Sequence, residues 1–541
     1  MSFRYELIEN KAWLLNLSTA DYQECDIPKL FHNDILDSDN KLIESTIRKS
    51  KSLVGIFSTS QTQRFGKNKR GNIIYLVKPL NNTLPSFLIS YGGKLKGKIA
   101  IKFKFTNWEN KLPSGEIIDV IGNYTDENLN KILMYHHNVF PKNIKLSNSK
   151  NPIEETIIRN KINTNIFSID PDNCQDIDDA LSITIKEDET IIGVHIAQPI
   201  CWLSIDDIYD KLKYQFSTLY MPDVRKDLWG DYVTKQSSLS ENEIKPAYTI
   251  QFYFKNNKLV KTEDFPSEIL NCKVLSYDNA ESYDEAVKLK EFTSNLSEIE
   301  DYHEVVSYWM LKTNQYIGNK FNNLKKKIPY RVNKDLNLEL EENENLNLLE
   351  QDKDIRSKFK SKKIESAYYS FEENNHETLK LSNYCHFTSP IRRLIDTWIH
   401  YYLTYSINEL NFDSTLNCDM INYLDNQTKR FHRDINLNES IKELFIDSNR
   451  LEREGYIFEI LSNNLIEIYI KDLGFVKVRL YNLKFDYLVK KEKSKTTLKL
   501  DYDNKQFIFK VGEKIDLLIN KLEEIIPKNK LLITLKNEII L

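Results

Sequence analysis

Apolar residues recur along the first part of the chain in short runs separated by turn residues. The runs are rich in β-branched and aromatic side chains and occupy residues 53–58, 72–77, 86–91, 98–105 and 116–122. Turn signals such as Gly71 and Gly92 lie between them. Several short strands at this spacing predict a small barrel or sandwich. We therefore expect a β-barrel over residues 46–150, after an N-terminal segment, residues 1–45, whose pattern is short, polar and mixed.

The middle of the chain passes from strand-like patterns to helical ones. Apolar runs that predict strands occupy residues 165–169, 181–185, 191–197 and 248–254. Residues 307–321 and 390–405 carry apolar side chains at helical spacing. Between these two helices, residues 335–354 are acidic and of low complexity, which we interpret as a solvated helix or loop. This order predicts a mixed α+β domain over residues 151–445.

The pattern returns to short strands over residues 446–541, which predicts a second small barrel. Its basic side chains include Lys471, Lys477, Arg479, Lys490, Lys491, Lys493 and Lys495. They either line a face for nucleic acid or serve as ordinary solubilising lysines. The whole chain has a net charge of −4. A uniformly basic coat is therefore excluded, whereas a local basic groove is not.

Composition narrows the class of protein. The chain has 541 residues, of which 41% are hydrophobic and 28% charged. This suits several globular domains and excludes collagen-like and wholly disordered classes. The six cysteines lie far apart without a CxxC pair, so a zinc cluster is not expected. Because no apolar run of about 18 residues and no secretory segment near Met1 occurs, we expect an intracellular protein, cytoplasmic or nuclear, without a membrane partner.

Five aspartates fall within ten residues, directly after one apolar strand and before the next. They are Asp170, Asp172, Asp176, Asp178 and Asp179. Clustered carboxylates repel one another unless a cation lies between them, and Mg²⁺ is the expected cation, with Mn²⁺ as an alternative. A pair of divalent ions is one known arrangement for phosphodiester hydrolysis. An EF-hand loop is excluded because Gln175 and Leu181 stand where it needs Gly and Glu. A solvated acidic turn remains the alternative.

A second constellation supplies positive charge. Residues 386–393 read His-Phe-Thr-Ser-Pro-Ile-Arg-Arg. Ser389 as N-cap and Pro390 as first residue predict that a helix begins here and offers its N–H groups to phosphate. Arg392 and Arg393 would lie in its first turn, where cations are disfavoured unless an anion binds. The alternative is a surface ion pair between Arg392 and Asp396, four residues apart.

With both constellations the chain resembles the RNB family of exoribonucleases, which includes RNase II, RNase R and the catalytic subunit of the exosome. The family's metal motif, IDP followed by D-x-DD, is matched at residues 169–171 and 176–179. Its arginine motif, HFTSPIRR, stands unbroken at residues 386–393. Weaker similarities lie between them: residues 193–197 resemble the HIAD strand, and residues 220–223 resemble YLPD.

The resemblance implies a fold as well as an activity. RNB enzymes place cold-shock OB-folds before the catalytic domain and an S1-type OB-fold after it. We therefore expect an α+β catalytic RNB domain flanked by all-β OB-fold barrels, of cold-shock type over residues 46–150 and of S1 type over residues 446–541. A first cold-shock domain would be either missing or reduced to residues 1–45.

The implied activity is Mg²⁺-dependent hydrolysis of single-stranded RNA in the 3′→5′ direction, releasing nucleoside 5′-monophosphates. The residues implied to bind metal are Asp170, Asp176, Asp178 and Asp179. The residues implied to be catalytic are Asp178, Arg392 and Arg393. Asp178 either positions the metal-bound water or binds a second metal. The expected RNA contacts are Tyr277, which matches a base-stacking tyrosine, and His386, Thr388, Ser389, Lys69 and Arg70.

Several positions depart from the family pattern. Gln198 replaces the aspartate of HIAD, and Leu394 replaces the tyrosine that follows PIRR. The helix that resembles VEE-x-MLLAN carries Ser307 and Tyr308 in place of its two glutamates. One of those glutamates is thought to assist catalysis, so the rate, the product length or activity itself could differ.

These departures keep a second function open, a catalytically impaired RNB protein that binds RNA without cutting it. A different metal nuclease acting on DNA is a third hypothesis, disfavoured by the barrels and the arginine motif. We expect a monomer whose partner is single-stranded RNA, with RNA-decay complexes as a further class of partner.

Overall fold

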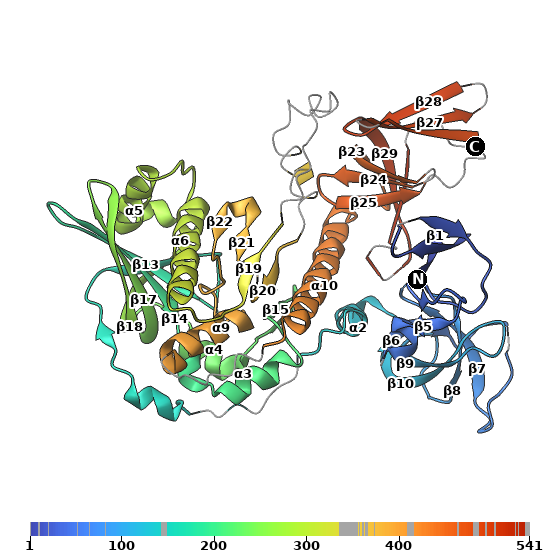
Figure 1. Cartoon of the computed structure of the whole chain (residues 1–541), viewed down its shortest axis with the longest axis horizontal. Coiled ribbons are helices and arrows are strands. Elements are labelled where there is room, and N and C mark those ends of the chain that lie inside the picture. Colours follow the sequence, from blue (N-terminus) through green and yellow to red (C-terminus); the bar gives the residue numbers. More distant parts are fainter. Residues whose placement is uncertain are drawn as a thin grey trace. The chain divides into compact units, whose positions relative to one another are not determined.

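The computed structural model describes residues 2–535, apart from 142–145, 335–354, 408–415, 480–485 and interruptions of one to three residues (Figure 1). The acidic stretch 335–354, expected to be a solvated helix or loop, lies outside the described residues. The chain divides into two compact units. Unit 1 comprises Met1–Phe140, Arg433–Asn438 and Lys521–Leu532, and unit 2 comprises the remainder.

Unit 1 begins with a five-stranded antiparallel sheet formed by the N-terminal segment. Its strands are β1 (Phe3–Ile8), β2 (Lys11–Asn16), β3 (Tyr22–Glu24), β4 (Ile35–Leu36) and β5 (Leu42–Glu44), in the order β3-β2-β1-β4-β5. The loop before β4 carries Phe31, which is fully buried. Its ring packs against Phe87 and Trp108, at centroid distances of 6.0 and 4.8 Å. Phe31 thus anchors the N-terminal segment on the hydrophobic core of the next domain.

The small barrel expected in the first part of the chain is present. Its strands are β6 (Leu53–Ser58), β7 (Ile73–Pro79), β8 (Phe87–Tyr91), β9 (Lys98–Asn107) and β10 (Ser114–Asn123), closed in the order β10-β8-β7-β6-β9. Strands β8 and β10 pair in parallel, whereas their other pairings are antiparallel. Helices α1 (Thr46–Lys49) and α2 (Leu129–His136) flank the barrel in the sequence. Lys69 and Arg70 are exposed in the turn between β6 and β7.

Unit 2 is built around one six-stranded sheet. Its strands are β11 (Asn160–Lys161), β12 (Ile166–Asp170), β13 (Asp179–Ile185), β14 (Thr190–Ala197), β17 (Ile244–Lys255) and β18 (Lys258–Ser276), in the order β11-β18-β12-β13-β14-β17. Strand β18 is long enough to pair twice. It is antiparallel to β17 over its first part and parallel to β12 over its last residues. The end of β18 is therefore brought beside the end of β12, where the aspartate cluster begins.

Helices cover this sheet and complete its core. They are α3 (Ile205–Leu212), α4 (Gly230–Ser237), α5 (Asp284–Ser294), α6 (Tyr302–Asn323) and α9 (Leu394–Tyr401) (Figure 1). Helix α10 (Cys418–Leu444) follows them in the chain, and its residues Arg433–Asn438 belong to unit 1. Helix α6 contains the predicted helix 307–321. Its Trp309 packs against Phe252 and Phe254 of β17, with ring centroids 5.6 and 6.0 Å apart. No helix in the described part of the chain is both long and apolar enough to cross a membrane.

Unit 2 also contains three two-stranded sheets. They pair β15 (Leu219–Tyr220) with β16 (Arg225–Lys226), β19 (Tyr330–Val332) with β20 (Tyr368–Ser370), and β21 (Asn375–His376) with β22 (Leu381–Ser382).

The C-terminal strands form a five-stranded sheet and a three-stranded one. The first contains β23 (Arg450–Ser462), β24 (Leu465–Ile470), β25 (Gly474–Arg479), β29 (Lys514–Lys521) and β30 (Leu531–Leu535), in the order β25-β24-β23-β29-β30. Counted in chain order, each strand of this sheet has the same neighbours as its counterpart in the first barrel. The exception is that the third and fifth strands, β25 and β30, are not paired among the described residues. The second sheet contains β26 (Asp486–Glu492), β27 (Lys495–Tyr502) and β28 (Lys505–Lys510). The side chains of Lys490, Lys491, Lys493 and Lys495 lie outside the described ones.

Candidate active site

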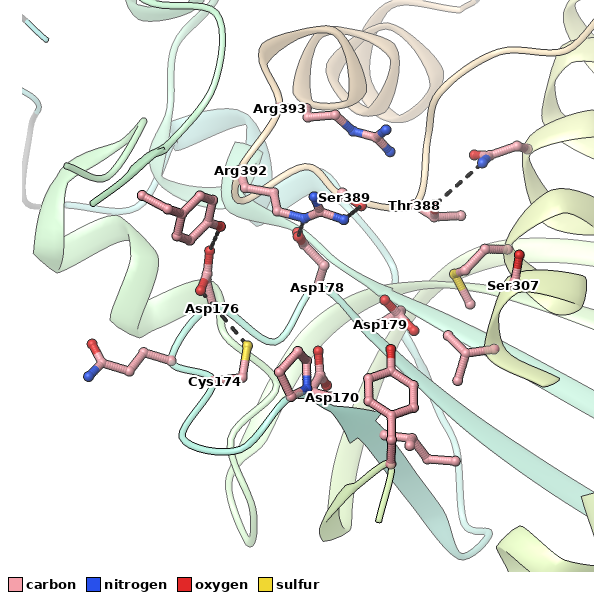
Figure 2. A pocket seen from close by; sticks show the side chains of 18 of the residues that line it. Asp170, Cys174, Asp176, Asp178, Asp179, Ser307, Thr388, Ser389, Arg392 and Arg393 are labelled. Carbon is pink, nitrogen blue, oxygen red and sulfur yellow. Dashed lines mark hydrogen bonds and ion pairs between the residues drawn. The ribbon is translucent and has the colours of Figure 1, made fainter. Parts of the chain in front are cut away.

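The aspartate cluster lines a cavity of about 750 Å³ in unit 2 (Figure 2). The walls come from the end of β12, the start of β13, the end of β18, helix α6 and the segment before α9. Among the predicted site residues, the cavity brings together Asp170, Asp176, Asp178, Asp179, Tyr277, Thr388, Ser389, Arg392 and Arg393. The motifs about 200 residues apart in the sequence therefore meet in one place.

Asp170 and Asp179 lie at the same end of two neighbouring strands. Strand β12 ends at Asp170, and its antiparallel neighbour β13 begins at Asp179. The chain returns between them through a turn in which Asn173 adopts a left-handed conformation with φ of 60°. Asparagine tolerates this region better than most residues, because its short polar side chain can bond locally. The turn and the strand pairing together place both carboxylates at one edge of the sheet.

These two carboxylates are electrostatically unfavourable as they stand. Burial, together with the charge of Asp178, raises the pKa of Asp170 to about 7. Burial, together with the charge of Asp170, raises the pKa of Asp179 to about 8. Atom Oδ2 of Asp170 is buried and has no hydrogen-bond partner. A hard divalent cation between the two carboxylates would relieve both the repulsion and the unsatisfied oxygen.

Asp178 is held differently, by the arginine segment. Its Oδ1 accepts a hydrogen bond from the backbone N–H of Ile391 at 2.7 Å, and its Oδ2 accepts one from Nε of Arg392 at 3.2 Å. Burial raises the pKa of Asp178 well above its usual value, whereas Arg392 and the Ile391 amide oppose that shift. Asp178 therefore joins the two motifs directly.

Asp176 contacts two residues to which the sequence motifs assigned no role. The Tyr220 hydroxyl donates to its Oδ2 at 2.5 Å, and Nη1 of Arg225 donates to its Oδ1 at 2.9 Å. Tyr220 lies inside the YLPD-like similarity, and Arg225 follows it. The signal for Arg225 in the sequence was an acidic residue, Asp227, two positions later.

The four aspartates do not all face one point. In the part of the chain that the structure describes, no three His, Cys, Asp or Glu side chains are grouped closely enough to form a ready metal site. Asp176 faces Arg225 and Asp178 faces Arg392 instead. The Asp170–Asp179 pair, with its unsatisfied oxygen, is the part of the cluster that fits a cation as it stands.

The helix expected to begin at Ser389 and Pro390 begins later. Helix α9 starts at Leu394, and a π-helical turn, Tyr402–Ser406, follows it. The prediction of a helical first turn is wrong because carboxylates and a neighbouring strand bind its backbone. Ser389 N–H donates to Asp396, and the carbonyl of Arg392 accepts from Thr218 N–H. The N–H groups near the cavity are thus occupied by aspartates rather than left for a phosphate.

The two arginines have different partners. Arg392 donates from Nε to Asp178 and from Nη2 to Ser389 Oγ, and its side chain is 47% exposed (Figure 2). Arg393 donates to Asp396 at 2.8 Å, and that carboxylate is completely buried. The alternative of a surface pair between Arg392 and Asp396 is therefore wrong, since Arg393 makes this contact. Both arginines line the cavity, and Arg392 is the more exposed of the two.

Comparisons with known proteins identify relatives of the chain. A family model described as RNB domain matches residues 159–295 and 282–409. Ribonuclease R of Aquifex aeolicus is 23% identical over 484 residues, covering 72% of this chain and 68% of that protein. Ribonuclease R of Chlamydia pneumoniae is 26% identical over 322 residues, which are 47% of its length. Residues 159–409 therefore match an RNB domain.

Solved structures share the fold over nearly the whole chain. Mycoplasma genitalium RNase R in complex with ribose-methylated single-stranded RNA aligns with a TM-score of 0.78 at 17% identity, covering 99% of this chain and 100% of that one. Yeast Ssd1, described as a pseudonuclease, aligns with a TM-score of 0.67 at 12% identity, covering 93% and 81%. The family resemblance read from the motifs is confirmed, and the fold is shared by an RNase and by a pseudonuclease.

The departures from the RNB pattern differ in how close they lie to the cavity. Ser307 lines the cavity, so the replacement of this glutamate by serine removes a charge from the cavity wall. Tyr308 is not among the lining residues and lies under the ammonium group of Lys312, 5.4 Å from the ring centroid. Leu394 is fully buried in the main core of unit 2.

Gln198 belongs to a buried structural network rather than to the cavity of the RNB domain. Its Oε1 accepts from Arg159 at 2.7 Å, and its Nε2 donates to Thr404 at 3.2 Å. Arg159 is already paired with Glu154 at 2.5 Å. A neutral amide therefore suits this position, because the arginine's charge is balanced elsewhere. The loss of the HIAD aspartate does not alter the cavity directly.

The remaining predicted RNA contacts lie in three settings. Tyr277 lines the cavity and stacks on His303, with centroids 3.5 Å apart and planes 15° apart. His386 does not line it, and instead its Nδ1 shares a hydrogen bond with the Tyr369 hydroxyl at 2.7 Å. Lys69 and Arg70 belong to unit 1.

Asn314 of α6 fixes the loop that carries Thr388. Its Oδ1 accepts from Phe387 N–H at 2.8 Å, while its Nδ2 donates to Thr388 Oγ1 at 3.4 Å and to the Tyr384 hydroxyl at 3.2 Å. Asn314 was visible in the sequence as the last residue of the VEE-x-MLLAN-like helix, but its role is evident only from the packing.

Proposed function

We propose that the protein is a 3′→5′ exoribonuclease that hydrolyses single-stranded RNA to nucleoside 5′-monophosphates with Mg²⁺, or alternatively Mn²⁺, as cofactor. The observation that carries the proposal is the meeting of the Asp170–Asp179 pair with Arg392 in one cavity. The RNB domain over residues 159–409 and the ribonuclease R relatives support it.

Asp170, Asp176 and Asp179 would hold the cation, which supplies an activated water and neutralises phosphate charge when it is bound. Arg392 would bind the scissile phosphate and stabilise the charge that develops on it, since its planar fork matches phosphate oxygens. Asp178 and Ser389 already fix two of its nitrogens, so little orientation is lost on binding. Tyr277 would stack on a base with the ring face opposite His303.

We also propose that the barrel of unit 1 is an OB-fold that guides the RNA strand. Its strand order and the parallel pairing of β8 with β10 support this assignment. Exposed basic residues in its connections and at the start of β9, which would track phosphates, are Lys67, Lys69, Arg70, Lys94, Lys96 and Lys98. We assign the sheet of β23–β25, β29 and β30 to the same class, because its strand neighbours agree.

The test is a time course with 5′-labelled single-stranded RNA and Mg²⁺ on a sequencing gel. We expect a ladder that shortens from the 3′ end and disappears with EDTA or in Asp178→Asn. That variant should still retain RNA on a filter at the same protein concentration as the wild type. Wild-type turnover by Asp178→Asn, or equal degradation of a DNA strand of the same sequence, would refute the proposal.

The second candidate is an RNA-binding protein without nuclease activity. Two observations favour it: Ser307 stands in the cavity wall in place of a carboxylate, and the fold is shared with a pseudonuclease. It predicts salt-sensitive RNA retention without release of nucleotides, because phosphate contacts weaken as counterions accumulate. The same gel with a filter-binding assay separates the two candidates.

A further inference from the structure

Hairpin β15–β16 reaches the carboxylate of Asp176 from both of its strands. Tyr220 of β15 and Arg225 of β16 are direct cross-strand partners. The Tyr220 hydroxyl donates to Oδ2 and Arg225 Nη1 donates to Oδ1, so each carboxylate oxygen is held by a different strand. Such a two-point contact fixes the rotation of the carboxylate as well as its position.

Arg225 is itself oriented by a second buried carboxylate. Its Nε lies 2.5 Å from Asp227 Oδ1, and its Nη2 lies 3.2 Å from Asp227 Oδ2. The side chains of Asp176 and Asp227 are both 6% exposed. One guanidinium therefore bridges two buried acids through three different nitrogens. A lysine ammonium, with one nitrogen, could not reproduce this geometry.

The hairpin is also tied to the arginine segment of the site. Thr218, directly before β15, donates its N–H to the carbonyl of Arg392 at 3.0 Å, and Arg393 forms a bridge with Ser217. On its other side, Tyr220 N–H donates to His432 of α10 at 3.1 Å. A single short hairpin thus contacts both the acidic and the basic half of the site.

We propose that Arg225 is a positioning residue that sets the orientation of Asp176 for cation binding and, through the hairpin, keeps Asp176 in register with Arg392. The proposal rests on the proposed function only in taking the aspartate cluster as a cation site. Arg225 acts through Asp176 rather than on the RNA.

Two possible roles for Arg225 predict opposite changes in cation affinity when the residue is removed. If Arg225 contributed only its positive charge, its removal would make the site more negative and tighten cation binding. If it positions Asp176, its removal leaves the orientation of that carboxylate less restricted, although the Tyr220 hydrogen bond remains, and weakens binding. Loss of a residue that orients a metal ligand typically costs about 10- to 100-fold in metal affinity.

The experiment titrates the full-length protein with Mn²⁺ in the absence of RNA and follows the electron paramagnetic resonance signal of the unbound ion. Asp170→Asn defines which binding event belongs to the site. We expect Arg225→Gln to raise the Mn²⁺ dissociation constant about 10- to 100-fold, and Arg225→Lys to raise it nearly as much. Lys226→Gln, an exposed neighbour on the same strand, should bind as the wild type does.

Tighter or unchanged Mn²⁺ binding by Arg225→Gln would overturn the proposal, as would full recovery by Arg225→Lys. Wild-type protein that binds no Mn²⁺ at the site would overturn it as well. If Arg225→Gln does not fold, as judged by circular dichroism, Tyr220→Phe replaces it. That variant loses one hydrogen bond to Asp176 and should weaken binding about 3- to 10-fold, and unchanged binding would overturn the proposal.

The outcome is separable from that of the proposed function. A protein that binds Mn²⁺ in an Arg225-dependent manner but does not degrade RNA would refute the exoribonuclease and support the positioning role. A protein that degrades RNA and whose Arg225→Gln variant binds Mn²⁺ as the wild type does would support the exoribonuclease and refute the positioning role.

Discussion

Arg392 and Arg393 are adjacent in the sequence, yet their surroundings give them different roles. Arg392 is half exposed in the cavity and bonds to Asp178 and Ser389. Arg393 is mostly buried, and its partner Asp396 also accepts the backbone N–H of Ser389. Arg392 can therefore reach a substrate, whereas Arg393 secures the loop that carries Arg392.

We expect Arg392→Ala to lower kcat about 10²- to 10³-fold with little change in thermal stability, because it removes one donor to developing charge. Arg393→Ala should instead lower the free energy of unfolding by about 1–3 kcal/mol, since it leaves the buried Asp396 carboxylate without its ion pair. Single-turnover kinetics and urea unfolding of both variants provide the measurements. Each variant serves as the control for the other. If Arg393→Ala lost as much activity as Arg392→Ala and kept its stability, the division of roles between the two arginines would be contradicted.

At the scale of elements, the contact between α6 and the sheet determines one wall of the site. Three donors converge on Asp264 of β18: the hydroxyls of Tyr248 and Tyr316, both at 2.6 Å, and the ammonium of Lys320. Tyr316 and Lys320 belong to α6, whereas Tyr248 belongs to β17. One carboxylate therefore fastens the helix that presents Ser307 and Asn314 to the cavity.

Asp264→Ala should destabilise unit 2 by about 1–3 kcal/mol, because the buried Tyr248 hydroxyl loses its acceptor. Urea unfolding followed by tryptophan fluorescence would measure the change. Asp188→Ala removes an exposed carboxylate beyond β13 and is the matched control, with no change expected. Equal stability of the two variants would show that the Asp264 contacts are not what holds α6.

Sequence patterns predicted α6 well and α9 less well, for a reason that lies in the tertiary contacts. Residues 307–321 are helical, and their buried apolar side chains Trp309, Ile317 and Phe321 recur at helical spacing. Ser389 and Pro390 are good helix-starting residues, but a local preference of this kind is worth about 1 kcal/mol. Hydrogen bonds of this segment to Asp178, Asp396 and Thr218 outweigh it, and none of these partners is close in the sequence except Asp396.

At the scale of the whole molecule, buried histidines couple folding to pH. His195 lies in the sheet between Ser182 and Thr249, and His400 stacks on Phe387 at 3.7 Å. Burial lowers the pKa of each to about 3. The unfolded chain binds protons near pH 6.5, whereas the folded one does not, so each histidine costs stability as the pH falls below about 6.5. Asp170 and Asp179, with raised pKa values, act in the opposite direction.

Comparison of the wild type with His195→Gln isolates one of these contributions. In EDTA, the free energy of unfolding should fall by about 2 kcal/mol more in the wild type than in the variant between pH 7.5 and 5.0. Urea unfolding at both pH values measures this difference. Parallel pH profiles of the two proteins would contradict the assignment of His195 as a buried neutral group.

Periodicity and motifs alone predicted most element types, the family resemblance and the charged residues that line the cavity. Strand and helix periodicity is local, and the two RNB motifs are contiguous stretches, so both can be recognised from the sequence alone. Only the tertiary structure decided which partner each charged residue takes. It joined Asp178 to Arg392, gave Asp176 to Tyr220 and Arg225, and placed Gln198 beside Arg159, away from the cavity. Such pairings depend on distances between segments up to about 200 residues apart, which periodicity and motif spacing do not encode.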